Sequence, residues 1–336
     1  MNKKTRVTLK DIALKTGYTV NTVSHALKDK DDISQATKKK IQREAKKMGY
    51  INDILAGSLR SGITKTIAII LADISNPIFS IKVKEIDRVL RRYHYNTIII
   101  NTDEDSDIEY NAVMSAIGRK VDGIIICPTQ KDKRIFNLMR IHNIPFVLLG
   151  RRFSKDNNMN SVVWNDENGG YLATSHLIEL GKKRILFLNG PSNISSSQDR
   201  CNGYMRALNE HNLQIDPQLI VNVDILTNSS SVILKDIMQS DVKFDAIFAF
   251  SDFIAWEAIS TLKELGKDVP NDIPIVGFDD IQSHLKIPLP ITSIGADKTA
   301  EAEAAVRILL SHIDGKIDTK VYCEIIDTML VKRESA

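Results

Sequence analysis

Near residue 65 the spacing of apolar residues changes, and the change divides the chain into two parts of different architecture. Before it, apolar residues recur every three or four positions, as they do along one face of a short helix. After it, short apolar runs such as 66–71 and 123–127 alternate with amphipathic stretches such as 81–93. Buried strands that alternate with helices are typical of a parallel sheet with both faces covered. The chain of 336 residues therefore predicts a small all-α domain followed by a larger α/β body.

The body contains two such series, which predict two lobes. Strands are expected at residues 66–71, 97–100, 123–127 and 146–149 in the first series, and at 185–188, 246–250 and 275–278 in the second. After Pro290 the chain is expected to cross back, so that Lys298 to Ser311 rejoins the first lobe. Two doubly wound parallel sheets that face each other form a cleft, and open α/β sheets bind ligands at the carboxyl ends of their strands.

The first fifty residues predict three short helices. Thr8 with Asp11 forms a capping box, Thr19 and Ser34 are good N-caps for the next two helices, and Gly17 ends the first. The spacing of Ala13, Gly17 and Val23 is more specific, because two helices that cross over a tight turn need a small contact residue, a glycine and a branched plug. This pattern favours a helix-turn-helix over a generic three-helix domain.

Charge is divided unevenly along the chain. Residues 1–62 carry 14 Lys and Arg against 6 Asp and Glu, a net charge of +8, whereas the remainder carries 31 against 36, a net charge of −5. A basic head on a mildly acidic body is typical of a polyanion-binding module joined to a domain that binds something else. The alternative is a lysine-rich surface that is only solvated.

In a helix-turn-helix the second helix enters the major groove, and its early exposed residues face base edges. Val20, Asn21 and His25 are therefore the expected base-reading residues. An Asn amide can pair with adenine, and a His N–H can donate to guanine. The hydroxyls of three further residues are expected to hold phosphates, namely Thr8, Thr19 and Thr22.

These residues closely resemble the start of regulators of the lactose-repressor (LacI/GalR) family. The matching segments are Thr8-Leu9-Lys10-Asp11-Ile12-Ala13, Thr19 through Leu27, and Met48-Gly49-Tyr50, and the likeness runs along nearly the whole chain. His25 stands where the family usually has Arg, so the resemblance does not carry over the base preference at that position. The family's sensor domain resembles periplasmic sugar-binding proteins, which agrees with the two predicted lobes.

The resemblance implies a hinge between the head and the body. In the family this segment folds into a helix on the operator and inserts a leucine into the minor groove, a role that falls to Leu59, followed by Arg60. The family's proline is missing here, and Gly57 replaces its arginine. Because glycine in a helix costs about 1 kcal/mol relative to alanine, this hinge is expected to order less readily. A plain linker is the alternative.

The resemblance also implies an effector site in the cleft. Arg200 lies in an Arg-x-x-Gly-Tyr motif and Asp279 in Gly-Phe-Asp-Asp, and together they offer a planar donor and an acceptor for vicinal hydroxyls. Phe79, Arg151 and Ser251 follow predicted strands and complete the candidate set. The alternative for Arg200 and Asp279 is a surface or interlobe ion pair. A buried structural role is the preferred interpretation of Trp164, over a stacking platform for the ligand.

Several classes of protein are disfavoured. The chain lacks the nucleotide-binding, nucleophile-elbow and zinc-protease motifs, so no enzymatic activity, cofactor or metal is expected. The three cysteines lie far apart and are expected to be core residues. The polar N-terminus resembles no signal peptide, and no long apolar stretch follows, which predicts a cytoplasmic protein without membrane contact. A free-standing sugar-binding protein would also lack the basic head.

The expected protein is a repressor of a carbohydrate-utilisation operon, controlled by a small sugar or sugar phosphate. We expect a homodimer on a near-palindromic operator, and no heptad-bearing tail that would join dimers. The alternative is a catabolite-type regulator controlled by a phosphorylated carrier protein on lobe 1; Arg307 fits that pattern and Ala300 departs from it. The expected divisions are 1–50 for the DNA-binding domain, 51–64 for the hinge and 65–336 for the sensor. Lobe 1 would comprise about 65–163 and 293–325, and lobe 2 about 164–292 and 326–336.

Overall fold

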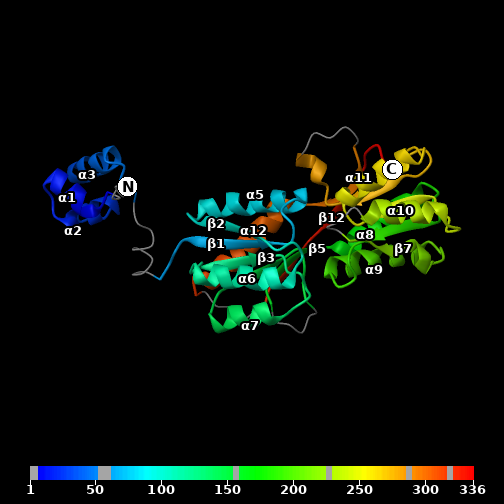
Figure 1. The fold of residues 1–336 in the computed structure, drawn as a ribbon, viewed down its shortest axis with the longest axis horizontal. Coiled ribbons are helices and arrows are strands. Elements are labelled where there is room, and N and C mark those ends of the chain that lie inside the picture. The colour runs from blue at the N-terminus through cyan, green and yellow to red at the C-terminus, as the bar shows by residue number, and fades with distance from the viewer. Residues whose placement is uncertain (1–6, 52–61, 154–158, 225–228, 285–289, 316–320) are drawn as a thin grey trace, which may run out of the picture. The chain divides into compact units, whose positions relative to one another are not determined.

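The structure is a computed structural model that describes residues 7–51, 62–153, 159–224, 229–284, 290–315 and 321–336. The chain divides into two compact units, Met1–Thr64 and Lys65–Ala336, which are termed here the head and the body (Figure 1). The head is all helical and the body is α/β, which confirms the predicted fold class.

The three predicted helices of the head are confirmed as α1 (Leu9–Thr16), α2 (Val20–Leu27) and α3 (Gln35–Lys47). Thr8 and Asp11 form the expected capping box, and Gly17 ends α1 in the left-handed conformation at φ 78°. The side chains of Thr19 and Ser34 cap α2 and α3. A small apolar core holds the three helices together and consists of Ile12, Ala13, Val23, Ala26, Ile41 and Ala45.

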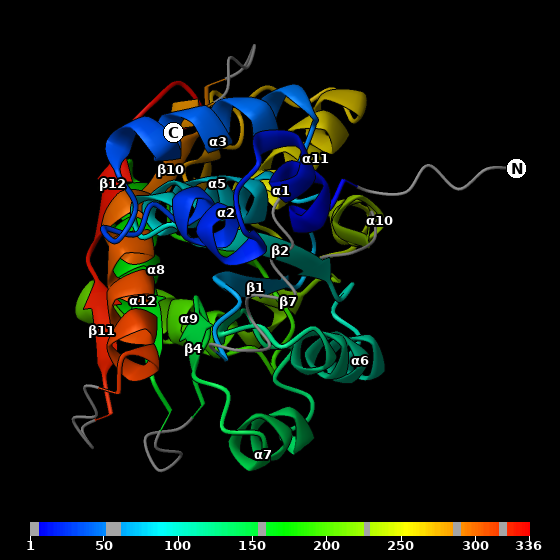
Figure 2. The same cartoon turned by 90° about the vertical axis from the view of Figure 1, so that its left-hand side faces the viewer.

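The first lobe of the body is a fully parallel sheet with the strand order β11-β5-β4-β3-β1-β2. The strands are β1 (Thr66–Leu71), β2 (Asn96–Asn101), β3 (Gly123–Ile126), β4 (Phe146–Leu149), β5 (Ser161–Trp164) and β11 (Cys323–Ile326). Helices α5 (Pro77–Arg92) and α12 (Lys298–Ile313) pack on one face, and α6 (Ser106–Gly118) and α7 (Arg134–Ile141) on the other. Figure 2 shows α12 on the opposite side of this sheet from α6 and α7.

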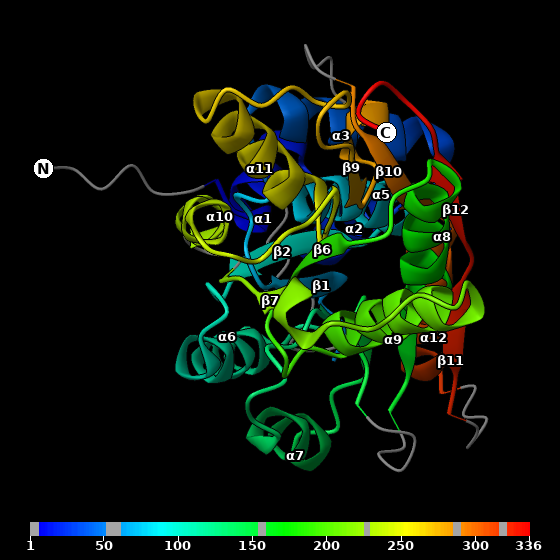
Figure 3. The same ribbon diagram turned by 90° about the vertical axis from the view of Figure 1, so that its right-hand side faces the viewer.

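The second lobe has the strand order β12-β10-β9-β8-β6-β7, in which only the β10–β12 pair is antiparallel. The strands are β6 (Ile185–Asn189), β7 (Ile220–Asn222), β8 (Ala246–Ala249), β9 (Ile275–Phe278), β10 (Thr292–Ala296) and β12 (Thr328–Val331). Helices α8 (Asp166–Glu179) and α9 (Ser195–Glu210) cover one face, and α10 (Ser229–Gln239) and α11 (Asp252–Glu264) cover the other (Figure 3). Two short 3₁₀ helices complete the lobe, η2 (Pro217–Leu219) and η3 (Ile281–His284).

The chain crosses between the lobes three times: between β5 and α8, between β10 and α12, and between β11 and β12. The boundary expected at residue 293 is wrong, because it falls inside β10, which pairs with β9 in the second sheet. The crossing therefore lies after Ala296 and not near Pro290. The sequence analysis missed β10 because its Thr-Ser-Ile-Gly-Ala sequence has no continuous apolar run, although four of its five residues are buried.

Two further observations bear on the expected exclusions. Within the described ranges, no helix is long and apolar enough to cross a membrane, and no group of His, Cys, Asp and Glu could hold a metal ion.

The expectation that all three cysteines are core residues is wrong: Cys127 is buried and Cys201 half-buried, but Cys323 is exposed. Cys323 begins the edge strand β11, where alternate side chains face away from the sheet.

Candidate functional site

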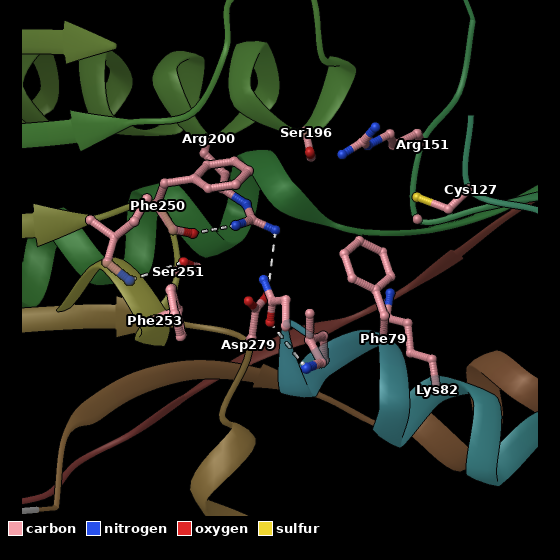
Figure 4. A pocket seen from close by; sticks show the side chains of 14 residues that line it. Phe79, Lys82, Cys127, Arg151, Ser196, Arg200, Phe250, Ser251, Phe253 and Asp279 are labelled. Carbon is pink, nitrogen blue, oxygen red and sulfur yellow. Dashed lines mark hydrogen bonds and ion pairs between the residues drawn. The ribbon is translucent and has the colours of Figure 1, made fainter. Parts of the chain in front are cut away.

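The five residues predicted for the effector site come together in one pocket between the lobes. The pocket occupies about 610 Å³, counting space that is open to solvent. It is lined by Asn76, Ile78, Phe79, Lys82, Cys127, Gly150, Arg151, Ser196, Arg200, Phe250, Ser251, Phe253, Ile254 and Asp279 (Figure 4). These residues follow the carboxyl ends of strands from both sheets, where open α/β sheets bind ligands.

Close packing of α8 against α9 fixes the position of Arg200. A Cβ atom on Gly203 would lie 2.0 Å from the backbone oxygen of Glu167, so only glycine allows the two helices to approach this closely. The approach places Asp166 Oδ1 2.8 Å from Arg200 Nε. Arg200 Nη1 also donates to the backbone oxygen of Phe250. Since Nε and Nη1 are engaged, Nη2 is the part of the guanidinium that faces the Asp279 carboxylate, as the dashed line in Figure 4 shows.

Asp279 is the acceptor that faces Arg200. It directly follows β9 at φ 100°, a conformation that few non-glycine residues adopt, and its N–H donates to Ile294 O at 2.7 Å. Its Oδ1 lies 3.8 Å from Arg200 Nη2, too far for a direct hydrogen bond. Among the residues that the structure describes, none donates a hydrogen bond to this carboxylate. Asp279 and Arg200 are both buried in the second lobe, so they form neither a surface pair nor an interlobe pair.

Asp279 influences a second buried carboxyl, Asp252. A Cβ atom on Gly277 would lie 2.3 Å from Asp252 Oδ1, so the glycine of the Gly-Phe-Asp-Asp motif makes room for this side chain. Burial, followed by the charge of Asp279, raises the pKa of Asp252 to about 8. Burial raises the pKa of Asp279 to about 6, although Arg200 and Lys82 oppose the shift. Asp252 therefore has the higher pKa of the two carboxyls, and Asp279 is the one that ionises first as the pH rises.

Arg151 lines the pocket but is already paired. Its guanidinium forms a bidentate contact with Glu104, with N–O distances of 2.9 Å and 2.5 Å, and donates to Pro128 O at 2.8 Å. Lys82, which the sequence analysis did not select, pairs with Glu301 at 2.8 Å. Each cation in the pocket therefore has its own carboxylate partner.

The other two predicted residues contribute capping and an apolar surface. The Ser251 hydroxyl accepts from Ile254 N at 3.3 Å and caps α11, so the sequence position that suggested a ligand contact also has a structural role. Phe79 packs against core residues of both lobes. Trp164 is buried beside Phe278, with ring centroids 6.2 Å apart, and does not line the pocket, as its structural interpretation predicted.

Several pocket residues were missed, and the sequence held signals for some of them. Ser196 lies four residues before Arg200 and Lys82 three residues after Phe79, so each shares a helix face with a predicted residue. Cys127 and Phe250 directly follow β3 and β8, as ligand-facing residues of this fold do. No comparable signal pointed to the carboxylate partners, because Glu104 and Glu301 are far from Arg151 and Lys82 in the chain.

In the head, five of the predicted DNA-binding residues lie at the beginnings of α1 and α2, and His25 lies in the last turn of α2. Val20 and Asn21 are exposed on α2, and the Thr19 hydroxyl lies 2.9 Å from that of Thr22. Thr8 is exposed beside the start of α1. Leu59 and Arg60, with most of the expected hinge, lie outside the described residues. Not every basic residue of the head faces solvent, since Lys38 is buried and contacts Asp29 Oδ1 at 3.0 Å.

His25 has a partner that the sequence analysis did not foresee. Its Nδ1 lies 2.5 Å from Oδ2 of Asp32, which follows α2. Because Asp32 occupies Nδ1, the other ring nitrogen, Nε2, is the atom that remains for a base edge. The contact therefore limits the orientation of the His25 imidazole and leaves only Nε2 for a hydrogen bond to DNA.

Comparison with known protein families identifies both units. Residues 8–53 match the family model described as bacterial regulatory proteins of the lacI family. Residues 64–305 match the model described as periplasmic binding proteins and sugar binding domain of the LacI family.

Full-length relatives and a solved structure agree with these matches. The chain is 32% identical over 329 residues to the HTH-type transcriptional regulator RegA of Clostridium saccharobutylicum, covering 97% of this chain and 98% of RegA. It is 30% identical over 311 residues to the HTH-type transcriptional repressor PurR of Aliivibrio salmonicida (strain LFI1238), covering 92% and 93%. The structure of the Lac repressor dimer bound to operator and the anti-inducer ONPF has a TM-score of 0.85 and 23% identity, covering 98% and 99%. This last likeness concerns the fold.

Proposed function

The chain belongs to the LacI family of DNA-binding transcriptional regulators, and from this premise we propose that it represses a carbohydrate-utilisation operon under the control of a small sugar. The observation that carries the proposal is the buried Asp279 carboxylate in the interlobe pocket, beside Arg200 and without a hydrogen-bond donor among the described residues. Because Asp279 lines the pocket, its carboxylate is open to the hydroxyl groups of a ligand.

The chemistry of the pocket suits a polyhydroxylated ring. Asp279 can accept from hydroxyls while Arg200 Nη2 donates, and Phe79 and Phe253 offer apolar surface to the ring faces. The description of the matching family model as a sugar binding domain supports the same class of ligand.

Charge compensation favours an uncharged sugar over a sugar phosphate. Arg151 is neutralised by Glu104, Arg200 by Asp166, and Lys82 by Glu301. The carboxylate of Asp279, whose charge is stabilised by Arg200, Lys82 and Lys298, would itself repel a phosphoryl group at close range. A phosphate would have to displace one of these carboxylates and leave it buried without a partner, which is strongly unfavourable.

The head is proposed to bind a near-palindromic operator as part of a homodimer in the cytoplasm. One recognition helix covers only a half-site, so a dimer is needed to read a full operator. Candidate contacts are Val20, Asn21 and His25 to bases, with Thr8, Thr19 and Thr22 to phosphates. Leu59 and Arg60 are proposed for the minor groove at the dyad.

Control by a phosphorylated carrier protein is less well supported by the described contacts. On α12 the exposed residues are Glu303 and Arg307, and both are paired, Glu303 with Arg92 and Arg307 with Glu324. A phosphoryl group on a partner would have to compete with Glu324 for Arg307. The interlobe pocket offers a site whose acceptor has no such competitor.

A thermal-shift screen of the full chain tests this proposal. Monosaccharides are compared with their own phosphates, because the two differ by the charged phosphoryl group that the pocket is expected to reject. A ligand present at 100 times its dissociation constant adds about 2.7 kcal/mol of stability, which gives a readily measured shift. Stabilisation by a neutral sugar that is lost in Asp279→Asn supports the proposal. Stabilisation by phosphates alone would contradict the charge argument, and no stabilisation by any sugar would remove the assignment.

A further inference from the structure

Beside the pocket, four residues join the two lobes directly without any ligand. Arg152 of the first lobe pairs with Asp199 of the second through N–O distances of 2.6 Å and 3.1 Å. Arg152 N donates to Ser195 Oγ at 3.0 Å, and Ser195 N donates to Gln130 Oε1 at 2.8 Å. Gln130 Nε2 closes the ring by donating to Arg152 O at 2.7 Å. These residues are termed here the interlobe latch.

The latch supplies a cap that helix α9 lacks. The N-cap position of α9, Ile194, has no side chain that could accept a hydrogen bond, whereas most helices of this chain are capped by a side chain of their own segment. The first N–H groups of a helix have no partner within the helix and need an outside acceptor. Gln130 provides that acceptor from the opposite lobe, so separation of the lobes would uncap α9.

The first-lobe side of the latch is held in a fixed conformation. Gln130 adopts φ 60°, an unusual value for a residue with a side chain. The preceding residue, Thr129, is fixed from behind by the buried Glu109, whose carboxylate accepts from Thr129 N and Oγ1, each at 2.8 Å. Thr129 O in turn accepts from Asn193 of the second lobe at 3.3 Å. Gln130 therefore belongs to a loop whose backbone is held in place by the first lobe itself.

Chain neighbours of the latch line a second cavity of about 1030 Å³, counting open space, which includes Glu104, Lys131 and Asn193 in its lining. The two cavities share no lining residue. In the chain, Gln130 lies between Cys127 of the pocket and Lys131 of the outer cavity, and Ser195 lies between Ile194 and Ser196 in the same way. Along the chain, these two latch residues therefore join the lining of the pocket to the lining of the outer cavity.

We propose that the interlobe latch closes the effector pocket on the side of the outer cavity and restricts it to a single sugar ring. Gln130, Arg152, Ser195 and Asp199 are then specificity-determining residues that select the length of the ligand without contributing its main polar contacts. This inference rests on the proposed function, because it takes the effector to be a sugar bound at Asp279.

The first experiment tests the latch without any ligand. Hydrogen exchange of the full chain is followed in peptides that cover the first turn of α9, in the native protein and in Gln130→Ala. Loss of the cap should speed exchange of the Ser195 amide roughly tenfold, as expected for one lost hydrogen bond. Arg206→Ala is the matched control, because it removes the Arg206–Glu167 pair of α9, at 2.6 Å, within one lobe. Equal exchange in the native protein and Gln130→Ala would overturn the latch.

The second experiment tests ligand length by calorimetry with D-glucose, D-ribose, maltose and cellobiose. The native protein should bind a monosaccharide and reject the disaccharides. Arg152→Ala should keep its monosaccharide affinity within about threefold and bind a disaccharide about tenfold more tightly than the native protein does, because a bidentate pair no longer has to be broken. Arg206→Ala should behave as the native protein.

The outcomes separate the two proposals. If the native protein binds a disaccharide as tightly as the matching monosaccharide, the restriction by the latch is wrong while the sugar-binding function stands. If none of the four sugars binds to any variant although Gln130→Ala still exposes the start of α9, the latch contacts are real but the sugar assignment fails, and the length restriction falls with it.

Discussion

The head and the body handle their candidate functional residues in opposite ways. In the head these residues stand on the surface of local helices, and Val20, at the start of α2, is 41% exposed. In the pocket, Arg151 and Asp279 are only 5% and 7% exposed, and each depends on residues far away in the chain. An exposed side chain has hydrogen-bonding capacity and charge close to those of its residue type, whereas the charge and free donors of a buried side chain depend on its partners. The comparison predicts that mutations in the two units produce separable effects.

Removal of residues 1–60 should produce the largest effect. Binding to the operator should be abolished, because the basic residues and the recognition helix are lost together. The body should remain folded, since its two sheets and their covering helices contain no residue of the head. Both tryptophans, Trp164 and Trp256, belong to the body, so fluorescence-detected unfolding reports on that unit alone. If the truncated body still retards operator DNA in a mobility-shift assay, the assignment of DNA binding to the head is wrong.

Asp279→Asn should weaken sugar binding by roughly 1.5 to 3 kcal/mol, the range for a hydrogen bond to a charged group. Operator affinity in the absence of the sugar should barely change. A ligand shifts a conformational equilibrium only through its differential affinity for the two states, so a variant that no longer binds it stays in the ligand-free form. If the sugar is an inducer, a reporter strain should be permanently repressed.

The matched control for this variant is Asp216→Asn, which removes a carboxylate that contacts Arg184 on the surface of the same lobe. It should leave induction intact. Normal induction in Asp279→Asn would place the effector elsewhere.

The pH dependence of sugar binding should sharpen the contrast further. Burial raises the pKa of Asp279 to about 6 from an ordinary value of 3.8. Sugar hydroxyls donate to the charged carboxylate, so the sugar affinity should fall about tenfold for each pH unit below 6. The free energy of unfolding of the ligand-free protein should change in the opposite direction. The native state favours protonated Asp279, so the contribution of this group to stability is present at low pH and is lost as the pH rises through 6. Calorimetry from pH 5 to pH 8 measures the first effect, and Asp279→Asn should flatten the profile.

Asp32→Asn should have the smallest effect and should be confined to the head. The asparagine keeps the size of Asp32 but removes the charged partner of His25 Nδ1, so the imidazole is held less firmly. Specific operator affinity should fall roughly threefold to tenfold, as expected for one hydrogen bond. Asp31→Asn, an exposed neighbour, is the control. A fluorescence-anisotropy titration that finds no difference between the two variants would show that His25 does not depend on Asp32.

The sequence predicted the head almost completely because its signals are local. The crossing of α1 and α2 is specified within sixteen residues, by the cap at Thr8, the tight turn at Gly17 and the branched side chain of Val23. Each of them lies close in sequence to the residues that it positions. The contact between His25 and Asp32 was missed because it links the helix to the turn after it, where no regular periodicity applies.

In the body, apolar runs predicted most central strands and the edge strand β2, but not the edge strands β7, β11 and β12. β11 and β12 alternate in burial or are only half buried, so they lack the continuous apolar run of a central parallel strand. The identity of the pocket residues was predicted from motifs, but their state of pairing was not. Glu104 and Glu301 reach Arg151 and Lys82 only after the first lobe has folded, and no spacing in the sequence indicates such a meeting.

The threefold crossing between the lobes also bears on how the protein is made. The segment that contains α1 to α3 can fold as soon as about fifty residues have left the ribosome. Neither sheet of the body is complete until β11 and β12, formed by the segment 323–331, have been synthesised. Domains generally fold as units during synthesis, beginning at the N-terminus. A nascent chain would therefore carry a folded head well before the body is complete, because both sheets are finished only after residue 331 has been synthesised.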